Sequence, residues 1–203
     1  MSAVGIVNYG IGNGGSIVNM FRKLRLQAEV VTTPEQVSAM QRLVLPGVGS
    51  FDACMNALKE SGLRDAVLQF SASGRPLLGI CVGMQMLTLG SEEGSSPGLG
   101  IIRAYAKRLI ATSSLRVPHI GWDAISWQRP DHPLARNLLD GSRFYFVHSY
   151  CVVCESPANS LATCTYGMEF SAAIASDRIA GVQFHPEKSH RFGLQLLSNF
   201  GNA

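Results

Sequence analysis

Short apolar segments alternate with amphipathic segments along the first half of the chain. Four apolar runs predict strands, at residues 3–7, 28–31, 43–45 and 76–80. Between and after these runs, apolar residues recur at helical spacing, which predicts helices at residues 17–24, 51–58, 63–70 and 82–89. A further helix is predicted to begin at Pro34, with Thr33 as its N-cap. Strands that alternate with helices indicate a parallel sheet covered by helices on both faces.

The second half has a different pattern. Residues 91–100 are rich in Gly, Ser and Pro and read as a loop. Strand-like runs separated by turn residues follow at residues 144–147, 150–153, 161–164, 172–175 and 179–184. These predict antiparallel or mixed sheet, and a last helix is expected at about residues 189–200. No internal repeat and no long polar linker divides the chain. We therefore expect one α/β domain over residues 1–203, with a mostly parallel or mixed central sheet flanked by helices.

Composition narrows the class of protein. The chain has 203 residues, of which 46% are hydrophobic, and a net charge of +3 without any block of like charge. These values exclude a disordered chain and give no reason to expect a nucleic acid or a membrane as partner. No apolar run is long enough to span a bilayer, and the first residues do not read as a signal peptide. Five cysteines, an odd number, do not describe a secreted disulfide framework, so we expect a cytoplasmic protein.

The sharpest local feature is the sequence Gly79-Ile80-Cys81-Val82-Gly83, which follows an apolar strand and leads directly into a helix. This is the nucleophile-elbow arrangement with Cys in place of Ser. The glycines allow a tight turn, the Val82 amide becomes an oxyanion donor, and the helix N-terminus favours a thiolate. The alternative interpretation is a small buried hydrophobic residue, which describes most free cysteines. The pentapeptide alone does not separate the two.

A cysteine nucleophile needs a base, and the base needs an orienting group. The sequence Gln183-Phe184-His185-Pro186-Glu187 supplies both at the end of an apolar strand. His185 would serve as the base, and Glu187 would accept a hydrogen bond from the other ring nitrogen. The alternative is a surface histidine near a surface glutamate. A strand this apolar is expected to end at the same sheet edge as the elbow, which favours the catalytic interpretation.

These two motifs, in this order and at this separation, resemble the class I (triad) glutamine amidotransferases. Further segments resemble, over essentially the whole chain, the glutaminase subunits of imidazole glycerol phosphate synthases; they are residues 46–51, 91–94, 117–122 and 145–150. The resemblance implies that Cys81 attacks the side-chain amide of glutamine, with His185 as base and Glu187 orienting it. It also implies an oxyanion hole from the backbone of Gly47, Val48 and Val82.

The resemblance assigns the substrate pocket and the partner as well. Substrate contacts would come from Gln85, Glu93, His148, Ser149 and Tyr150, although His148 could instead be a packed strand histidine. Ammonia would pass to a cyclase partner, a (β/α)8 barrel, in a heterodimer that makes imidazole glycerol phosphate and AICAR for histidine biosynthesis. The residues at that contact would be Trp122, Tyr145 and Lys188, and either aromatic residue could instead be core. Neither a metal nor a cofactor is implied.

Some positions depart from the family pattern. Asp123 stands where Asn commonly follows the Gly-Trp pair, and Asn8 stands where the first turn commonly begins with Asp. The pair Gly14-Gly15 is also unusual. These changes resemble paralogous glutaminases that supply ammonia to amidotransferases of surface-polysaccharide sugars. A non-catalytic partner subunit is a third hypothesis, which the intact Cys81, His185 and Glu187 disfavour.

Two weaker motifs complete the survey. Cys151 and Cys154 have the spacing of a redox or zinc pair, but a strand places them on opposite faces, and Cys164 stands alone. We expect all three to be structural. The glycine-rich turn at residues 10–15 is similar to a nucleotide-binding turn, but no acidic residue follows a second strand in the expected context.

Overall fold

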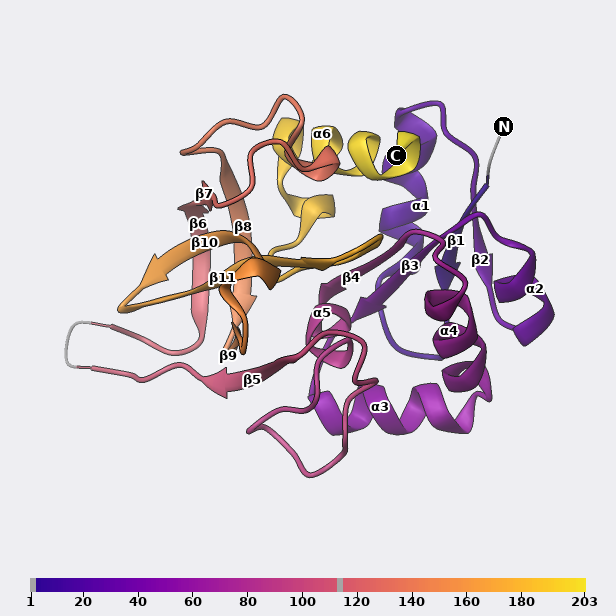
Figure 1. Cartoon of the computed structure of the whole chain (residues 1–203), viewed down its shortest axis with the longest axis horizontal. Coiled ribbons are helices and arrows are strands. Elements are labelled where there is room, and N and C mark those ends of the chain that lie inside the picture. Colours follow the sequence, from indigo (N-terminus) through magenta and orange to yellow (C-terminus); the bar gives the residue numbers. More distant parts are fainter. Residues whose placement is uncertain (1–2, 113–114) are drawn as a thin grey trace.

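The computed structural model describes residues 3–112 and 115–203 of the chain. Five strands form the parallel part of its main sheet: β1 (Val4–Val7), β2 (Ala28–Val31), β3 (Arg42–Gly47), β4 (Leu77–Cys81) and β12 (Ile179–Val182). Their order in space is β2-β1-β3-β4-β12 (Figure 1). The most buried strands, β1, β3, β4 and β12, are apolar on both faces, as expected for parallel strands covered by helices.

The sheet continues through antiparallel strands on the far side of β12. Strand β11 (Met168–Ser176) pairs with β12, and β10 (Ser160–Tyr166) pairs with β11. The remaining members are β5 (Ala104–Arg108), β7 (Ser126–Trp127) and β9 (Tyr150–Cys154). A separate antiparallel pair consists of β6 (His119–Ala124) and β8 (Arg143–His148), which we call the β6–β8 pair. In Figure 1 these strands gather at the end of the molecule opposite β2.

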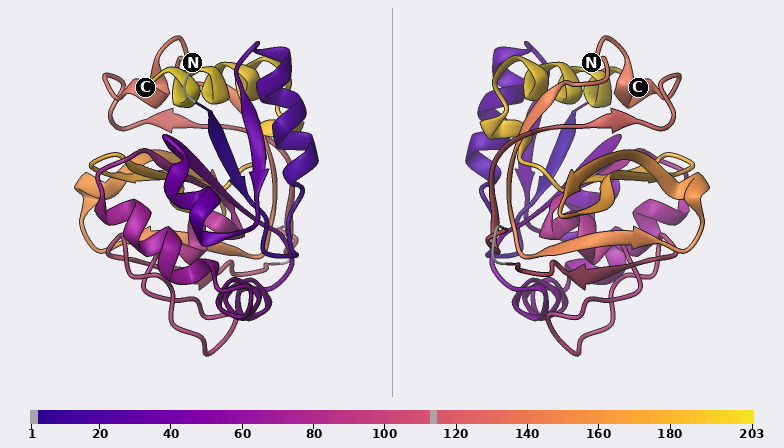
Figure 2. Two further views of the ribbon diagram at one scale, coloured as in Figure 1. Left: turned by 90° about the vertical axis from the view of Figure 1, so that its right-hand side faces the viewer. Right: turned by 90° about the vertical axis from the view of Figure 1, so that its left-hand side faces the viewer.

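Helices cover both faces of the parallel strands. They are α1 (Gly14–Lys23), α2 (Pro34–Ala39), α3 (Phe51–Glu60), α4 (Leu63–Ala72), α5 (Val82–Met86) and α6 (His190–Asn202). Helices α1 and α6 pack on one side of the sheet, and α3 and α4 lie on the other (Figures 1 and 2). Short 3-10 turns lie at Pro133–Ala135, Pro157–Asn159 and Pro186–Lys188.

The α/β class with a mostly parallel central sheet is confirmed, and so are most predicted elements. Thr33 caps α2 in a full capping box. Its side-chain hydroxyl accepts from the backbone N–H of Gln36, and the side-chain oxygen of Gln36 accepts from the backbone N–H of Thr33. Helix α5 is shorter than the predicted 82–89, because residues 87–90 turn away from the helix to hydrogen-bond with the 98–106 segment. The hydrophobic pattern does not predict strands β5, β6 and β7, since β7 has only two residues and β5 and β6 contain few large apolar side chains.

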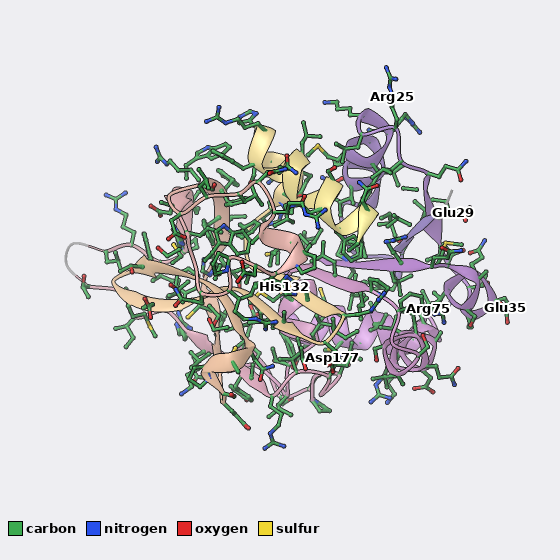
Figure 3. All side chains as sticks on the ribbon, turned by 45° about the horizontal axis from the view of Figure 1, so that its top comes forward. Arg25, Glu29, Glu35, Arg75, His132 and Asp177 are labelled. Carbon is green, nitrogen blue, oxygen red and sulfur yellow. The ribbon has the colours of Figure 1, made fainter. Side chains whose placement is uncertain are left out.

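Several charged side chains extend outward far from the sheet edge that carries the two motifs. Figure 3 shows Arg25, Glu29 and Glu35 extending outward from the end of the molecule that carries α1, β2 and α2. No helix within residues 3–112 and 115–203 is long and apolar enough to cross a membrane.

Candidate active site

Cys81 lies at the sharp turn between β4 and α5. Its backbone has φ 55° and ψ −114°, a conformation that side-chain-bearing residues rarely adopt. Such strain is characteristic of nucleophile elbows, because it lifts the side chain above the end of the strand. The thiol is buried with its residue 5% exposed, directly at the N-terminal end of α5. Both interpretations of the pentapeptide therefore hold in part, since this cysteine is buried and also stands on an elbow.

Close backbone packing fixes the elbow. A Cβ atom on Gly83 would lie 1.9 Å from the Leu45 carbonyl oxygen, and one on Gly47 would lie 2.5 Å from the Gly83 nitrogen. Gly47 also pairs with Cys81 in the parallel register of β3 and β4. Only glycine allows β3 to approach the elbow this closely. The 46–49 loop is thereby held against the first turn of α5.

His185 and Glu187 lie at the end of the strand next to the elbow. Val182, the last residue of β12, pairs with Ile80, and His185 follows three residues later. The Nδ1 atom of His185 is 2.7 Å from Oε1 of Glu187, and both side chains are 5% exposed. The opposite nitrogen, Nε2, is buried and has no conventional hydrogen-bond partner among the described residues. That nitrogen is the one left for the Cys81 sulfur, as in a triad.

The charges around His185 favour its protonated form. Burial alone would lower the pKa of His185. Its interactions with the Cys81 sulfur and the Glu187 carboxylate outweigh burial and raise the pKa to about 9. A histidine that binds a proton this firmly can hold a proton taken from a neighbouring nucleophile and give it later to a leaving group.

Gln183 is a site residue that the sequence analysis quoted only as part of a motif. It is fully buried, and its Nε2 atom lies 3.8 Å from the Cys81 sulfur. Its Oε1 accepts from Nε2 of Gln85 at 3.1 Å, and the same Gln85 atom donates to the Tyr150 carbonyl at 3.2 Å. The signal was present in the sequence, because residues 183 and 185 share one face of an extended segment.

A pocket of about 340 Å³ opens over the thiol. Its walls include the elbow residues Cys81 and Val82, the base His185, and all five predicted substrate-binding residues, which are Gln85, Glu93, His148, Ser149 and Tyr150. Val48, Gly49, Pro118, Val147 and Lys188 complete the lining. The Oε1 atom of Gln85 is buried and has no partner within the described ranges, so an acceptor remains available to a ligand. His148 is both packed and pocket-lining, which unites the two interpretations of that residue.

Reciprocal hydrogen bonds tie Glu93 to the start of α3. Its Oε2 atom accepts from the Phe51 amide at 2.7 Å, in the first turn of the helix. Asp52 of the same turn accepts from the amides of Ser95 and Ser96 at 3.0 and 2.9 Å. These backbone hydrogen bonds lower the pKa of Asp52. The loop after Ser91 is thus anchored where it brings Glu93 to the pocket.

Tyr9, another residue without a predicted role, supports the opposite side of the pocket. Its hydroxyl donates to the Pro46 carbonyl at 2.7 Å, and burial raises the pKa of this phenol. The Cys54 thiol donates to the Val48 carbonyl at 3.2 Å. The two contacts hold the Pro46 and Val48 carbonyl groups of the 46–49 loop. Gly49, with φ 86°, then turns the chain into α3.

The three residues predicted at the partner contact lie together on the surface. The rings of Trp122 and Tyr145 meet edge to face at 6.0 Å, and the Lys188 ammonium lies 5.4 Å from the centre of the Tyr145 ring. His190 stacks on Trp122 at 5.1 Å. Trp122 and Tyr145 are partly exposed and Lys188 is exposed, so none of them is a core residue.

Hydrogen bonds of the main chain and of the Ser189 hydroxyl join this surface to His185. The His185 amide donates to the Tyr145 carbonyl at 2.9 Å, and the Tyr145 amide donates to the Ser189 hydroxyl at 3.0 Å. The Ser189 hydroxyl donates in turn to the His185 carbonyl at 2.6 Å. We call this closed set of three hydrogen bonds the Tyr145–Ser189–His185 ring. It locks the backbone of the base to strand β8.

The other cysteines have no catalytic surroundings. All five cysteines are free thiols, and Cys54, Cys151 and Cys164 are buried. Burial raises the pKa of Cys151 to about 11 and that of Cys164 to about 12. Cys154 is half-buried beside Ser171. Within the described residues no cluster of three His, Cys, Asp or Glu side chains could hold a metal ion.

Two solved structures have a similar fold, and one of them is a glutamine amidotransferase. The structure of PurLQS from Thermotoga maritima superposes with a TM-score of 0.77 over 100% of this chain and 99% of its own, at 16% identity. A crystal structure of a glutamine amidotransferase gives 0.74 over 98% and 99%, at 18% identity. At these identities the likeness concerns the fold.

Curated proteins match more closely in sequence. The imidazole glycerol phosphate synthase subunit HisH 2 of Methanococcus maripaludis is 47% identical over 97% of this chain and 98% of its own length. The protein of the same name from Pseudomonas aeruginosa is 44% identical over 96% of each. The subunit HisH of Leptospira interrogans is 42% identical over 98% and 99%.

A family-wide comparison covers nearly the whole chain. The family described as glutamine amidotransferase class-I matches residues 5–202, a range that includes the elbow, the His-x-Glu segment and every pocket residue named above. This match agrees with the elbow cysteine, with the glutamate-bound histidine at the neighbouring strand end and with the full-length relatives. The chain belongs to the class-I glutamine amidotransferases.

Proposed function

We propose that this chain is the glutaminase subunit of an imidazole glycerol phosphate synthase, which hydrolyses glutamine and delivers the ammonia to a cyclase partner. The observation that carries the proposal is the glutamate-bound His185 beside an elbow cysteine, in a pocket lined by polar groups. The relatives named as subunits of that synthase support the choice of reaction. We assign residues 1–203 to one glutaminase domain that acts in the cytoplasm.

In the first half of the reaction, Cys81 would act as the nucleophile and His185 as the acid and base. The thiolate forms a bond to the side-chain amide carbon of glutamine, and the carbonyl oxygen becomes an oxyanion. The tetrahedral intermediate collapses with cleavage of the C–N bond. His185 gives its proton to the leaving nitrogen, so that ammonia departs and a glutamyl thioester remains on Cys81.

In the second half, water would hydrolyse the thioester. His185 takes a proton from the water as its oxygen attacks the thioester carbon. The C–S bond then breaks, which frees the thiolate of Cys81 and the carboxylic acid of the product. That acid loses its proton to water and leaves as glutamate, and His185 keeps its own proton for the next cycle. Glu187 keeps the imidazole oriented through both halves and stabilises its positive charge.

The oxyanion would bind to backbone amides of Val82 and of the Gly47-Val48 segment. One such donor stabilises the transition state by about 3 kcal/mol. The contact of Gly47 with Gly83 brings the two peptide segments within van der Waals distance. Gln85, Glu93, His148, Ser149 and Tyr150 would hold the polar groups of the substrate.

The surface of Trp122, Tyr145 and Lys188 would bind the (β/α)8 cyclase subunit in a heterodimer. Large aromatic side chains that are partly exposed are typical anchors of such interfaces. The Tyr145–Ser189–His185 ring gives this surface a direct connection to the catalytic base. The client reaction would yield imidazole glycerol phosphate and AICAR.

A second client has specific support. Asn8 and Asp123 depart from the pattern of the synthase family, and two of the relatives carry the number 2 in their names. A glutaminase of the same chemistry could supply ammonia to an amidotransferase of surface-polysaccharide sugars.

Purification of the chain with its companion protein from the source organism distinguishes the two clients. We expect a cyclase barrel as companion, with formation of imidazole glycerol phosphate and AICAR that depends on glutamine or on ammonium salts. A sugar amidotransferase as companion would establish the second client instead. A companion with no glutamine-dependent activity would refute the glutaminase assignment.

A further inference from the structure

A chain of hydrogen-bonded side chains runs from the surface of the β6–β8 pair to the candidate glutamine pocket. Oδ2 of Asp123 lies 2.6 Å from Nε2 of His119. Nδ1 of His119 lies 3.0 Å from Nε2 of His148, and Nδ1 of His148 lies 2.8 Å from the Tyr150 carbonyl oxygen. The Asp123 side chain is 41% exposed, whereas that of His119 is 1% exposed. This series of hydrogen-bonded side chains therefore begins in solvent and ends inside the pocket wall.

Further contacts extend the chain to the nucleophile. The Tyr150 carbonyl that holds His148 also accepts from Gln85, and Gln85 contacts Gln183. Gln183 reaches the Cys81 sulfur. A change in the hydrogen bonding of His148 thus acts on a carbonyl group whose other partner is a pocket residue.

The Tyr150 carbonyl determines where the protons lie. A carbonyl oxygen only accepts, so Nδ1 of His148 must carry its hydrogen. Burial lowers the pKa of His148 to about 3, which keeps the ring neutral and leaves Nε2 as an acceptor. His119 must then donate from Nδ1. Its other nitrogen faces a carboxylate, which is also an acceptor, so one additional proton must lie between His119 and Asp123.

Loss of the additional proton from the His119–Asp123 pair forces one hydrogen bond of this series to break. A neutral His119 has a single hydrogen for two acceptors. If His119 donates to the ionised Asp123, the Nδ1 atom of His119 is left with a lone pair that faces Nε2 of His148. His148 must then carry its hydrogen on Nε2, and it no longer donates to the Tyr150 carbonyl. Burial lowers the pKa of His119, and Asp123 opposes that shift. The competition between the two acceptors exists because position 123 is a carboxylate.

We propose that Asp123 is a positioning residue for glutamine binding, which sets the tautomers of His119 and His148 and thereby whether His148 holds the Tyr150 carbonyl. This inference rests on the proposed function for its effect on glutamine. When the His119–Asp123 pair holds its proton, the pocket wall is fully hydrogen-bonded. When the pair is deprotonated, His148 releases Tyr150 and the wall loosens.

Other titratable or charged groups face this chain from each neighbouring strand. They are Arg143 on β8, Cys164 and Tyr166 on β10, and His185 after β12. Tyr166 stacks on the His119 ring at 3.9 Å, and Arg143 donates to the Trp122 carbonyl. Burial holds Cys164 neutral, and His185 carries the same sign of charge as a protonated His119.

Asp123→Asn tests the proposal, because an asparagine amide donates to His119 without titrating. Nitrogen NMR of 15N-histidine-labelled full-length chain reads the tautomers directly, with no need for turnover. We expect His148 in the wild type to move its hydrogen from Nδ1 to Nε2 as the pH rises. In the variant it should stay on Nδ1 throughout. Glu169→Gln, which removes an exposed carboxylate on β11, is the matched control and should titrate like the wild type.

Steady-state kinetics of the complex with its companion gives the second readout. One hydrogen bond of ordinary strength corresponds to about a 3- to 10-fold change in affinity. The KM for glutamine in the wild type should rise by about that factor across the titration, with little change in kcat, and the Asn variant should remove the rise. A His148 tautomer that is the same at every pH in the wild type, or the same pH dependence in Asp123→Asn, overturns the proposal. A complex without glutaminase activity refutes the proposed function alone, because the NMR result still decides the tautomers.

Discussion

The two walls of the candidate pocket are built in different ways. The wall of β3, β4 and β12 is formed by backbone contacts, in which Gly47 and Gly83 allow peptide groups to touch the elbow. The wall of the β6–β8 pair is formed by side chains, in which His119, His148 and Asp123 share protons. The first wall has no room for an added methyl group at Gly47 or Gly83, whereas we propose that the second changes its hydrogen bonds with pH. The proposed bond-making groups, Cys81 and His185, lie on the rigid wall, and the proposed partner-contact and positioning residues, Trp122 and Asp123, lie on the adaptable one.

The largest expected effect comes from the nucleophile on the rigid wall. Cys81→Ala should abolish glutamine-dependent activity of the complex, a loss of about 10,000-fold or more, because no other group can form the thioester. Activity with ammonium salts should persist, since the synthase partner needs only ammonia. Parallel assays with glutamine and with ammonium chloride measure both quantities.

Cys154→Ser is the matched control for that variant. Cys154 is half-buried beside Ser171, outside the pocket, and its replacement should leave both activities within about twofold of the wild type. Persistent glutamine turnover in Cys81→Ala would show that another residue is the nucleophile.

Gly47→Ala probes the backbone contacts themselves. The new Cβ atom would lie 2.5 Å from the Gly83 nitrogen, so the 46–49 loop must move away from the elbow. If an oxyanion donor is displaced, glutamine turnover should fall about 100- to 1,000-fold while partner affinity changes little. Gly15→Ala is the control, because Gly15, like Gly47, does not have a positive φ, and an added Cβ there meets no atom within 4 Å. Equal losses of turnover in the two variants would indicate general backbone strain instead.

Glu187→Gln removes the charge beside the base but keeps an acceptor for Nδ1. The pKa of His185 should fall below its raised value of about 9, and glutamine turnover should fall about 100-fold.

The pH dependence of the free energy of unfolding should change as well in Glu187→Gln. A raised pKa stabilises the folded state fully below pH 6.5, and this stabilisation is lost as the pH rises through about 9. Urea unfolding across that range should show a weaker pH dependence in the variant, and an unchanged slope would argue against the ion pair.

Trp122→Ala addresses the adaptable wall at the partner surface. Loss of an aromatic anchor that stacks on His190 should weaken binding of the companion by about 10- to 30-fold. Val30→Ala truncates an exposed side chain on the edge strand β2, at the other end of the sheet, and should bind normally. Calorimetric titration of the companion measures both. Equal affinities would place the docking surface elsewhere.

The last expected effect is a stability change from the buried histidine of the adaptable wall. His148 has a pKa of about 3 when folded, so the unfolded chain binds a proton below pH 6.5 that the folded chain does not. The free energy of unfolding should therefore fall as the pH falls through this window. His148→Gln should reduce that slope, and His190→Gln, which changes an exposed histidine, should not. Identical slopes in all three proteins would contradict a neutral His148.

The sequence predicted the rigid wall better than the adaptable one, for a physical reason. Backbone contacts require glycine, and a nucleophile elbow requires a fixed spacing, so Gly79, Cys81 and Gly83 carry a local signal. The pairing of His119 with His148 depends on the register of β6 and β8, two strands separated by a long segment without clear alternation. Asp123 could be noticed as a departure, but its contact with His119 follows only from the folded strand. Gln183 could have been identified from the sequence, since it shares a face of the extended segment with His185.

The Tyr145–Ser189–His185 ring has a consequence for how such a glutaminase can evolve. The ring uses main-chain atoms of Tyr145 and His185 together with one serine hydroxyl, and no atom of the Tyr145 side chain. Natural selection can therefore exchange the exposed side chains at positions 122, 145 and 188 to fit a new companion, while the base keeps its position. The lineage could acquire another client enzyme by altering its outer surface alone, with the hydrolytic apparatus inherited intact.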